Sequence, residues 1–307
     1  MKQTIIASII ITLAFVGCES SEILTLPHQE KRLVVNCVGF NNHKWFARIS
    51  ASQDILEVKP FDTINNAIVK IYENGVFAET LTLSDQFYTQ IGTLYEGTTS
   101  KPKPGKIYKI TVERPGLPMA ESEFTQPDSI PIKDLEFEKL GPSTRESYPG
   151  SFDSRVTITF DDPEGENYYE ILGAFRAELG SPSVIMQGQV PMTFIDPAYS
   201  ENNETFAYNT LAMNDRYFNG KTTTLDFLVT TSLGPDGDDL IQEYEYTFVI
   251  RNVTKEYYNY LKTTSLQKKT ANDPFAQPVV MSNNITNGYG IFGGYTQSDW
   301  YVTVPKE

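Results

Sequence analysis

The chain has 307 residues and a formal net charge of −14 at pH 7, from 25 Lys and Arg against 39 Asp and Glu. An acidic chain repels phosphate backbones, so nucleic acid is excluded as an expected partner. Hydrophobic residues make up 40% of the chain and aromatic residues 12%, which is too rich for disorder and sufficient for two folded domains.

The first residues have the form of a secretory signal. Lys2 precedes an apolar run over residues 4–16, which is too short to cross a bilayer as a helix, and Gly17 stands before Cys18. We therefore predict a signal peptide over residues 1–17. A cysteine after the cut is typical of a lipobox, so we expect diacylglycerol on its thiol and palmitate or a similar acyl chain on its amino group. The alternative is an ordinary secretory signal with an incidental cysteine.

A polar tether is expected over residues 18–31, and strands follow it over residues 32–126. Short runs rich in β-branched and aromatic residues, separated by turn formers, predict these strands. The runs cover residues 33–40, 45–52, 67–73, 77–83, 87–91 and 107–114. Even spacing without intervening helical patterns predicts an antiparallel β-sandwich of the immunoglobulin-like or fibronectin-like kind.

Residues 127–132 contain two prolines and predict a stiff linker to a second β-rich, sandwich-like domain over residues 133–307. The predicted strands of this domain cover residues 133–139, 155–160, 167–175, 184–190, 222–231 and 243–251. The expected fold is therefore mostly β, with two sandwich-like domains.

One helix is predicted near residues 254–268. Thr254 can cap its start, and Tyr257, Leu261 and Ser265 recur at helical spacing. Glycines alternate with Ile and aromatic residues over residues 287–295, which predicts a strand that lets another backbone come close. We expect this strand beneath the helix.

Three C-terminal segments, residues 257–261, 273–278 and 282–295, combine aromatic residues with Asn, Pro or Gly. These segments resemble an uncharacterised lipoprotein family of Bacteroidota, known only as a domain of unknown function. Further matches are Asp162-Pro163-Glu164 before Asn167-Tyr168-Tyr169, and residues 214–221, where Asn214 and Asn219 replace the Ser and Asp that are frequent in the family.

The resemblance covers nearly all the chain after the signal. Members have a lipobox followed by a sandwich-like domain, and they are commonly encoded beside TonB-dependent outer-membrane receptors. The resemblance therefore implies a lipid-anchored protein of the outer membrane, on the cell surface or the periplasmic face, with a TonB-dependent receptor as partner. It implies no activity and no cofactor.

No catalytic set is predicted. The two histidines, His28 and His43, lie in the tether and in an early turn, which is poor placement for a Ser-His-Asp triad, and no Cys/His cluster suits zinc. Cys37 is expected to be a small buried strand residue rather than a nucleophile.

Acidic turns are weak candidates for calcium. Asp236, Asp238 and Asp239 flank Gly237, and more acids cluster over residues 161–166, but neither group has the spacing of a twelve-residue calcium loop. Acidic residues in turns are usually just solvated, so we expect no bound metal.

Four further residues are candidates for surface chemistry. Trp45 and Trp300 are possible stacking platforms for a sugar ring, although core packing is the commoner role of tryptophan in a sandwich. Thr63 and Ser129 stand in Asp-Thr-Ile and Asp-Ser-Ile triplets that look like the periplasmic O-glycosylation sequon of these bacteria, and triplets this short also occur by chance.

Three functions remain open. The leading hypothesis is a non-enzymatic accessory or binding component of a TonB-dependent uptake or surface system. The first alternative is a glycan-binding surface lipoprotein for nutrient capture. The second is a carboxylate- or metal-dependent hydrolase, which only the acidic turns suggest.

Overall fold

A computed structural model describes residues 30–54, 64–85, 92–143, 151–179, 185–200, 205–206, 210–232, 241–273 and 275–305. Several predicted features lie outside these residues and stay predictions: the signal peptide, Cys18, Thr63, the strand over residues 87–91, and Asp236, Asp238 and Asp239.

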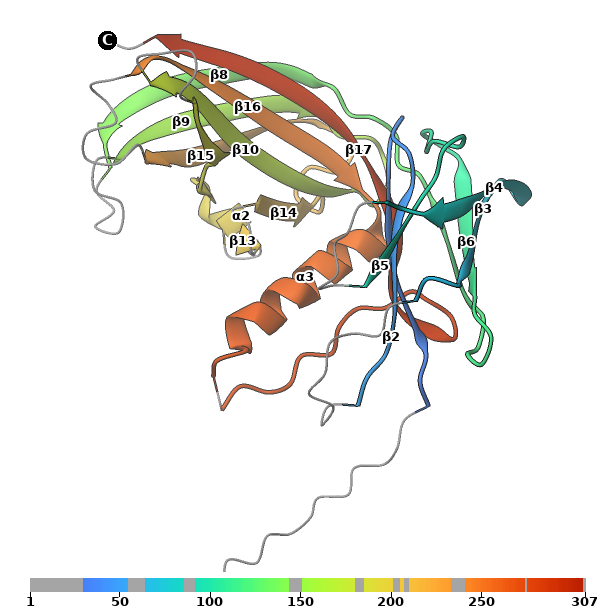
Figure 1. The fold of residues 1–307 in the computed structure, drawn as a ribbon. Helices are drawn as coiled ribbons and strands as arrows, with labels where there is room; N and C mark the ends of the chain where they lie inside the picture. The colour runs from blue at the N-terminus through green and yellow to red at the C-terminus, as the bar shows by residue number, and fades with distance from the viewer. Residues whose placement is uncertain are drawn as a thin grey trace, which may run out of the picture. The chain divides into compact units, whose positions relative to one another are not determined.

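The chain from Lys31 onward forms one compact unit (Figure 1). It is mostly β, with a helix near the C-terminus, as the sequence predicts. It has two large hydrophobic cores. One is built mainly by residues before 126 and the other by residues after 129. Among the described residues, no helix has both the length and the apolar character that crossing a membrane requires.

In the described part of the chain before the linker, there are seven strands. They are β1 (Leu33–Phe40), β2 (Phe46–Ala51), β3 (Ile68–Glu73), β4 (Val76–Leu83), β5 (Thr93–Glu96), β6 (Ile107–Glu113) and β7 (Ala120–Thr125). Alternate residues of β1, including Leu33, Val35 and Cys37, point into the first core, as expected for a strand with one covered face.

The described residues after the linker form ten strands and two helices. The strands are β8 (Ile132–Pro142), β9 (Ser151–Asp161), β10 (Tyr168–Leu179), β11 (Ile185–Gln189), β12 (Met192–Phe194), β13 (Thr205–Phe206), β14 (Thr210–Asn214), β15 (Thr222–Ser232), β16 (Ile241–Val253) and β17 (Gly288–Pro305), and the helices are α2 (Pro197–Ser200) and α3 (Lys255–Thr270). Strands β12, β15, β9 and β8 form a four-stranded sheet, in that order. The second core brings apolar side chains of this sheet together with those of β10 and β16.

The long strand β17 connects the two cores. Its first half pairs with β1 in parallel, from Gly288 opposite Leu33 to Tyr295 opposite Phe40. Its second half pairs with β16 antiparallel, from Tyr295 opposite Val253 to the end of the strand. One sheet of thirteen strands therefore continues from the first predicted domain into the second (Figure 1). The parallel pairing departs from the antiparallel arrangement that strand spacing predicts, because spacing carries no information about a partner 255 positions away.

The glycines of β17 allow two close approaches, as their pattern predicts. A Cβ on Gly290 would lie 2.1 Å from the carbonyl oxygen of Val35 in β1, and Gly290 has a φ of +112°. A Cβ on Gly293 would lie 2.7 Å from Oγ1 of Thr254, at the start of α3. The predicted position of this strand beneath the helix is confirmed.

Helix α3 begins where the sequence predicts and extends two residues further. Thr254 is its N-cap, with Oγ1 accepting a hydrogen bond of 3.3 Å from the backbone N–H of Tyr257. Tyr258 packs on Tyr168 of β10, with ring centroids 4.9 Å apart. The helix thereby covers the face of β10 and β16 that points away from the second core.

The linker is held against β16 and β17. Nε2 of Gln126 donates to the carbonyl oxygen of Tyr295 at 2.7 Å. The carbonyl oxygen of Asp128 accepts from Nδ2 of Asn252 at 3.0 Å and from Oγ1 of Thr296 at 2.8 Å. These bonds fix the segment that passes from one core to the other.

Candidate functional site

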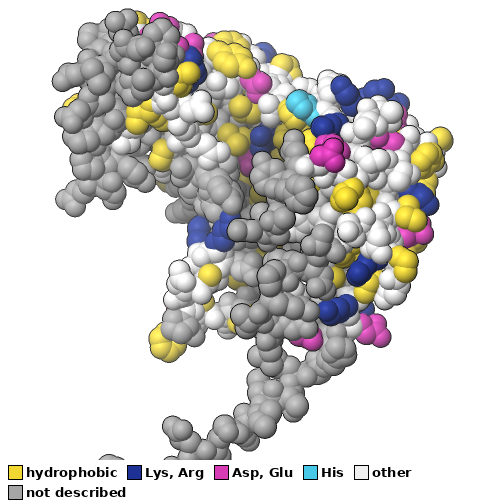
Figure 2. All heavy atoms as spheres, in the orientation of Figure 1, with side chains coloured by type: hydrophobic (Ala, Val, Ile, Leu, Met, Phe, Trp, Pro, Cys, Tyr) yellow, Lys and Arg dark blue, Asp and Glu magenta, His cyan; other side chains and the backbone are white. Residues whose placement is uncertain are grey.

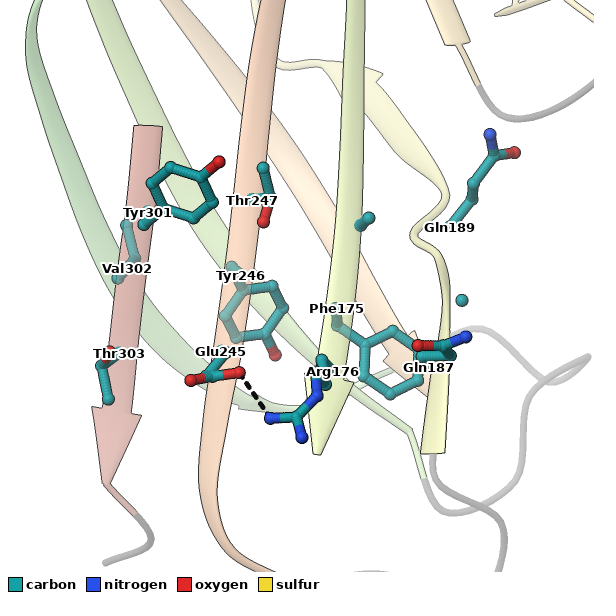
Figure 3. A pocket seen from close by; sticks show the side chains of 12 residues that line it. Phe175, Arg176, Gln187, Gln189, Glu245, Tyr246, Thr247, Tyr301, Val302 and Thr303 are labelled. Atoms are coloured by element: carbon teal, nitrogen blue, oxygen red, sulfur yellow. Dashed lines mark hydrogen bonds and ion pairs between the residues drawn. The ribbon is translucent and has the colours of Figure 1, made fainter. Parts of the chain in front are cut away.

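A hollow of about 690 Å³ lies over strands β10, β11, β16 and β17 (Figure 3). Strand register places its polar side chains in two rows across the sheet. The first row is Gln187, Arg176, Glu245 and Thr303, and the second is Gln189, Ala174, Thr247 and Tyr301. Residues directly opposite one another share a face, so each row presents its side chains together.

These rows lie on the face opposite the second core. The alternate residues Phe175, Tyr246 and Val302 pack in or against that core, so their neighbours in sequence must point the other way. Ala174 has a short side chain in the middle of the second row, which leaves space between the longer side chains around it.

An exposed ion pair lies in the first row, where Nη1 of Arg176 is 2.8 Å from Oε2 of Glu245 (Figure 3). Nη2 of Arg176 lies 2.8 Å from Oε1 of Glu178. The hydrogen bonds to Glu245 and Glu178 raise the pKa of the Arg176 guanidinium, a group that is charged at neutral pH in any environment. The carboxylates of Glu245 and Glu178 orient the Arg176 guanidinium. The amides and hydroxyls of the two rows can then contact a ligand.

Tyr301 supplies an exposed aromatic ring at this hollow. Its side chain is 72% exposed, although Trp300 beside it is half-buried and packs against the second core. Adjacent residues of a strand face opposite ways, so the two rings cannot serve the same surface. Trp300, the residue predicted to stack on a sugar, therefore faces the core side of the sheet. The aromatic ring exposed at the hollow is that of Tyr301.

The prediction that Trp45 offers a ring to a sugar was wrong. This side chain has no exposed area and packs against Tyr108, with ring centroids 5.1 Å apart. Nε1 donates to Oγ of Ser100 at 3.3 Å. Trp45 is a core residue, which is the commoner role of tryptophan in a β-sandwich.

The acidic turn after β9 forms a structural network. Oδ2 of Asp162 accepts from the backbone N–H of Gly220 at 2.7 Å, and Oδ1 accepts from the hydroxyl of Tyr169. Oδ2 of Asp215 accepts from the backbone N–H of Asn167 at 2.9 Å. Burial raises the pKa of Asp162 against the opposing effect of its hydrogen bonds. In the part of the chain that the structure describes, no three His, Cys, Asp or Glu residues are grouped to hold a metal.

A family model described as a domain of unknown function, DUF4249, matches residues 21–299. The chain belongs to this family. No curated protein matches the chain.

The segments that carry the resemblance to the family have structural roles in this DUF4249 protein. Asp162 and Asn167 join the turn after β9 to the turn that contains Asp215. Asn284 closes a two-way bond with the backbone of Phe292, accepting at 2.9 Å and donating at 2.6 Å. The polar residues of these segments therefore hold turns and strands together, and the hollow lies outside them.

Two other candidate residues have contrasting positions. Cys37 is 1% exposed in β1, as predicted, and burial raises the pKa of its thiol well above the ordinary value. Ser129 is exposed on the linker, with Oγ 3.5 Å from Oγ of Ser298. The O-glycosylation candidate Ser129 thus has a hydroxyl at the surface.

Sequence reasoning did not find the hollow. The strands that build it were largely predicted, but their register was not, and register decides which side chains meet. One signal was present in the sequence: Trp300, Val302 and Val304 alternate with Tyr301 and Thr303, which carry hydroxyl groups, so Trp300 and Tyr301 belong to opposite faces of a strand.

Proposed function

We propose that this protein is a lipid-anchored, non-enzymatic binding protein of the outer membrane that captures a ligand at the hollow. The carrying observation is the pair of cross-strand rows, which surround about 690 Å³ with amides, hydroxyls, one ion pair and the exposed ring of Tyr301. Sites for small ligands combine concavity with a few placed polar groups and an aromatic surface. The anchor rests on the lipobox at Cys18.

The composition of the hollow supports binding over hydrolysis. A carboxylate-based hydrolase needs two acids on opposite sides of the scissile bond. The described lining contains one carboxylate, Glu245, and Arg176 holds it in an ion pair. That lining contains no histidine or cysteine that could act as base or nucleophile.

A glycan is the ligand class that Tyr301 favours. An exposed aromatic ring offers an apolar face with a polar edge, and neighbouring amides and hydroxyls can bond sugar hydroxyls. Glycan capture is also the function of the first alternative from the sequence, a surface lipoprotein that binds nutrients. The proposed binding protein therefore includes that alternative.

A glycan array with the purified protein tests the ligand class. Tyr301→Ala should lower the affinity for any bound glycan by about tenfold or more, because it removes the exposed ring. Tyr289→Ala is the matched control, since Tyr289 is 39% exposed on the same strand but roughly 40 Å away. Silence of the native protein across a broad array would reject a glycan ligand.

The second part of the proposal is that the protein associates with a TonB-dependent outer-membrane receptor. The family resemblance supports this association. A tag at the C-terminus and extraction in mild detergent allow recovery of the protein with its partners. We expect one such receptor in near-equal amount. Recovery of the lipoprotein alone, under conditions that keep other receptor complexes intact, would reject the partnership.

A further inference from the structure

The two most exposed large hydrophobic side chains of the described residues lie on one segment. Phe275 is 93% exposed and Val280 is 87% exposed, and both belong to the connection from α3 to β17. Leu266, on the last turns of α3, is 41% exposed. We name Leu266, Phe275 and Val280 the apolar tip.

The segment that carries the apolar tip is held by hydrogen bonds. Oδ1 of Asp273 accepts from the backbone N–H of Phe275 at 2.9 Å, which forms a turn directly after the helix. The backbone N–H of Ser282 donates to Oγ1 of Thr263 on α3 at 3.0 Å. Because both ends are tied to the helix or its turn, the fold itself presents Phe275 and Val280 to solvent.

The segment that carries the apolar tip is cationic, although the protein is acidic. Residues 262–282 include three lysines, Lys262, Lys268 and Lys269, against the single acid Asp273, whereas the whole chain carries −14. Figure 2 shows basic side chains over the C-terminal part of α3 and a hydrophobic side chain at the far end of the segment after it. Basic groups beside exposed apolar groups match an anionic bilayer surface.

The apolar tip lies at the same end of the fold as the start of β1. From Val280 the chain runs eight residues to Gly288, which pairs with Leu33 at the start of β1. The start of β1 and the segment after α3 lie at the same end in Figure 1. Thirteen residues, 18–30, separate the lipidated position from the folded unit, a reach of at most about 45 Å.

We propose that the apolar tip inserts into the surface of an anionic lipid bilayer, beside the lipid anchor. This inference rests on the anchoring part of the proposed function. Insertion would fix the orientation of the fold, because the hollow lies near Thr303, at the other end of β17 and up to about 50 Å from Gly288. The ligand site is thereby held away from the bilayer.

The test uses the lipidated full chain in vesicles of phosphatidylethanolamine and phosphatidylglycerol. Phe275→Trp places a reporter at the tip, and Val76→Trp is the control, since Val76 is 69% exposed at the start of β4. Adding brominated lipid should quench the Phe275→Trp emission by about twofold or more beyond that of the control. Replacing both Lys268 and Lys269 with Glu should weaken this quenching in anionic vesicles.

Flotation of the same samples separates the two claims. If the protein floats with the vesicles but Phe275→Trp and Val76→Trp are quenched equally, the lipid anchor is supported. The insertion of the apolar tip is then overturned. Protein that does not float overturns both. A third outcome would assign the apolar tip to a protein partner instead of the bilayer. In that case Phe275→Trp shows no quenching, and Phe275→Ser no longer recovers the receptor in the pull-down.

Discussion

At the scale of single residues, burial decides the role of the carboxylates in this protein. Asp162 is 5% exposed, and both of its oxygens accept hydrogen bonds, from Tyr169 and Gly220. In the sequence it was one of several acids in a turn that resembled a weak calcium site. A carboxylate with both oxygens engaged by the protein is a structural acceptor.

Replacing Asp162 with Ala should destabilise the protein by about 2–4 kcal/mol, because the buried Tyr169 hydroxyl and the Gly220 N–H lose their acceptor. Asp162→Asn should cost only about 1 kcal/mol, since its amide can accept from Gly220 and donate to Tyr169. Urea unfolding at neutral pH measures both. Equal losses for the two variants would show that the hydrogen bonds contribute little.

The same residue gives a pH dependence with a defined sign. Burial holds the folded-state pKa of Asp162 above its ordinary value of 3.8, so the folded protein binds the proton more tightly than the unfolded chain does. Stability from this group is complete below 3.8 and is lost as pH rises through the raised pKa. The unfolding free energy of the native protein relative to Asp162→Asn should therefore fall across that window. A rise would contradict the assignment.

At the scale of elements, β17 holds the fold together because its two halves pair with different partners. Gly290 lets β17 approach β1, and Gly293 lets it pass under α3. The same strand then places Trp300 against the second core and Tyr301 at the hollow. A change in one half of β17 therefore affects both cores.

Gly290→Ala should destabilise the protein by roughly 3 kcal/mol or more, since its Cβ would meet the Val35 carbonyl and its φ is positive. Gly141→Ala is the matched control, with a φ of +121° and nothing within 4 Å of the added Cβ. That variant should lose only the backbone strain, about 1–2 kcal/mol. Thermal unfolding followed by circular dichroism compares them, and equal losses would mean that close approach to β1 is unimportant.

Thr254→Ala should cost about 1 kcal/mol, because α3 loses its N-cap acceptor. The same oxygen lies 3.4 Å from the backbone N–H of Gly294, so the loss also loosens the helix from β17. Thr254→Ser keeps the hydroxyl and should remain near the native stability. Hydrogen exchange in the first turn of α3 is the local readout, and unchanged protection in Thr254→Ala would argue against the cap.

At the scale of the whole molecule, the two cysteines report on the proposed anchor. If Cys18 is acylated, Cys37 is the one thiol of the mature protein, and it is buried in β1 with a raised pKa. Burial and a raised pKa both suppress thiolate chemistry.

We therefore expect no thiol to react with a disulfide reagent in the folded protein purified from membranes, and one thiol to react after denaturation. Cys37→Ala should abolish the second signal. A thiol that reacts rapidly in the folded Cys37→Ala variant would belong to Cys18 and would contradict lipidation. Cys18→Ala should release the protein from the membrane fraction.

The local sequence was enough to predict an element where interactions between neighbouring residues determine its bounds. β1 has the predicted bounds because its run of apolar and β-branched residues ends before the turn formers at residues 41–42, and α3 begins as predicted because Thr254 is a strong cap. The short strands β5, β7, β12, β13 and β14 were not predicted. Strands of this kind carry too few residues for a pattern, and their pairing partners decide whether they form.

By itself, the sequence determined the acidic charge, the mostly β character, the C-terminal helix and the glycine-lined strand beneath it. The tertiary structure alone decided that β17 pairs in parallel with β1, that Trp45 is core, and that Tyr301 rather than Trp300 faces a hollow. The reason is that a strand pattern fixes which residues alternate. The register between strands far apart in the chain decides which side chains come together.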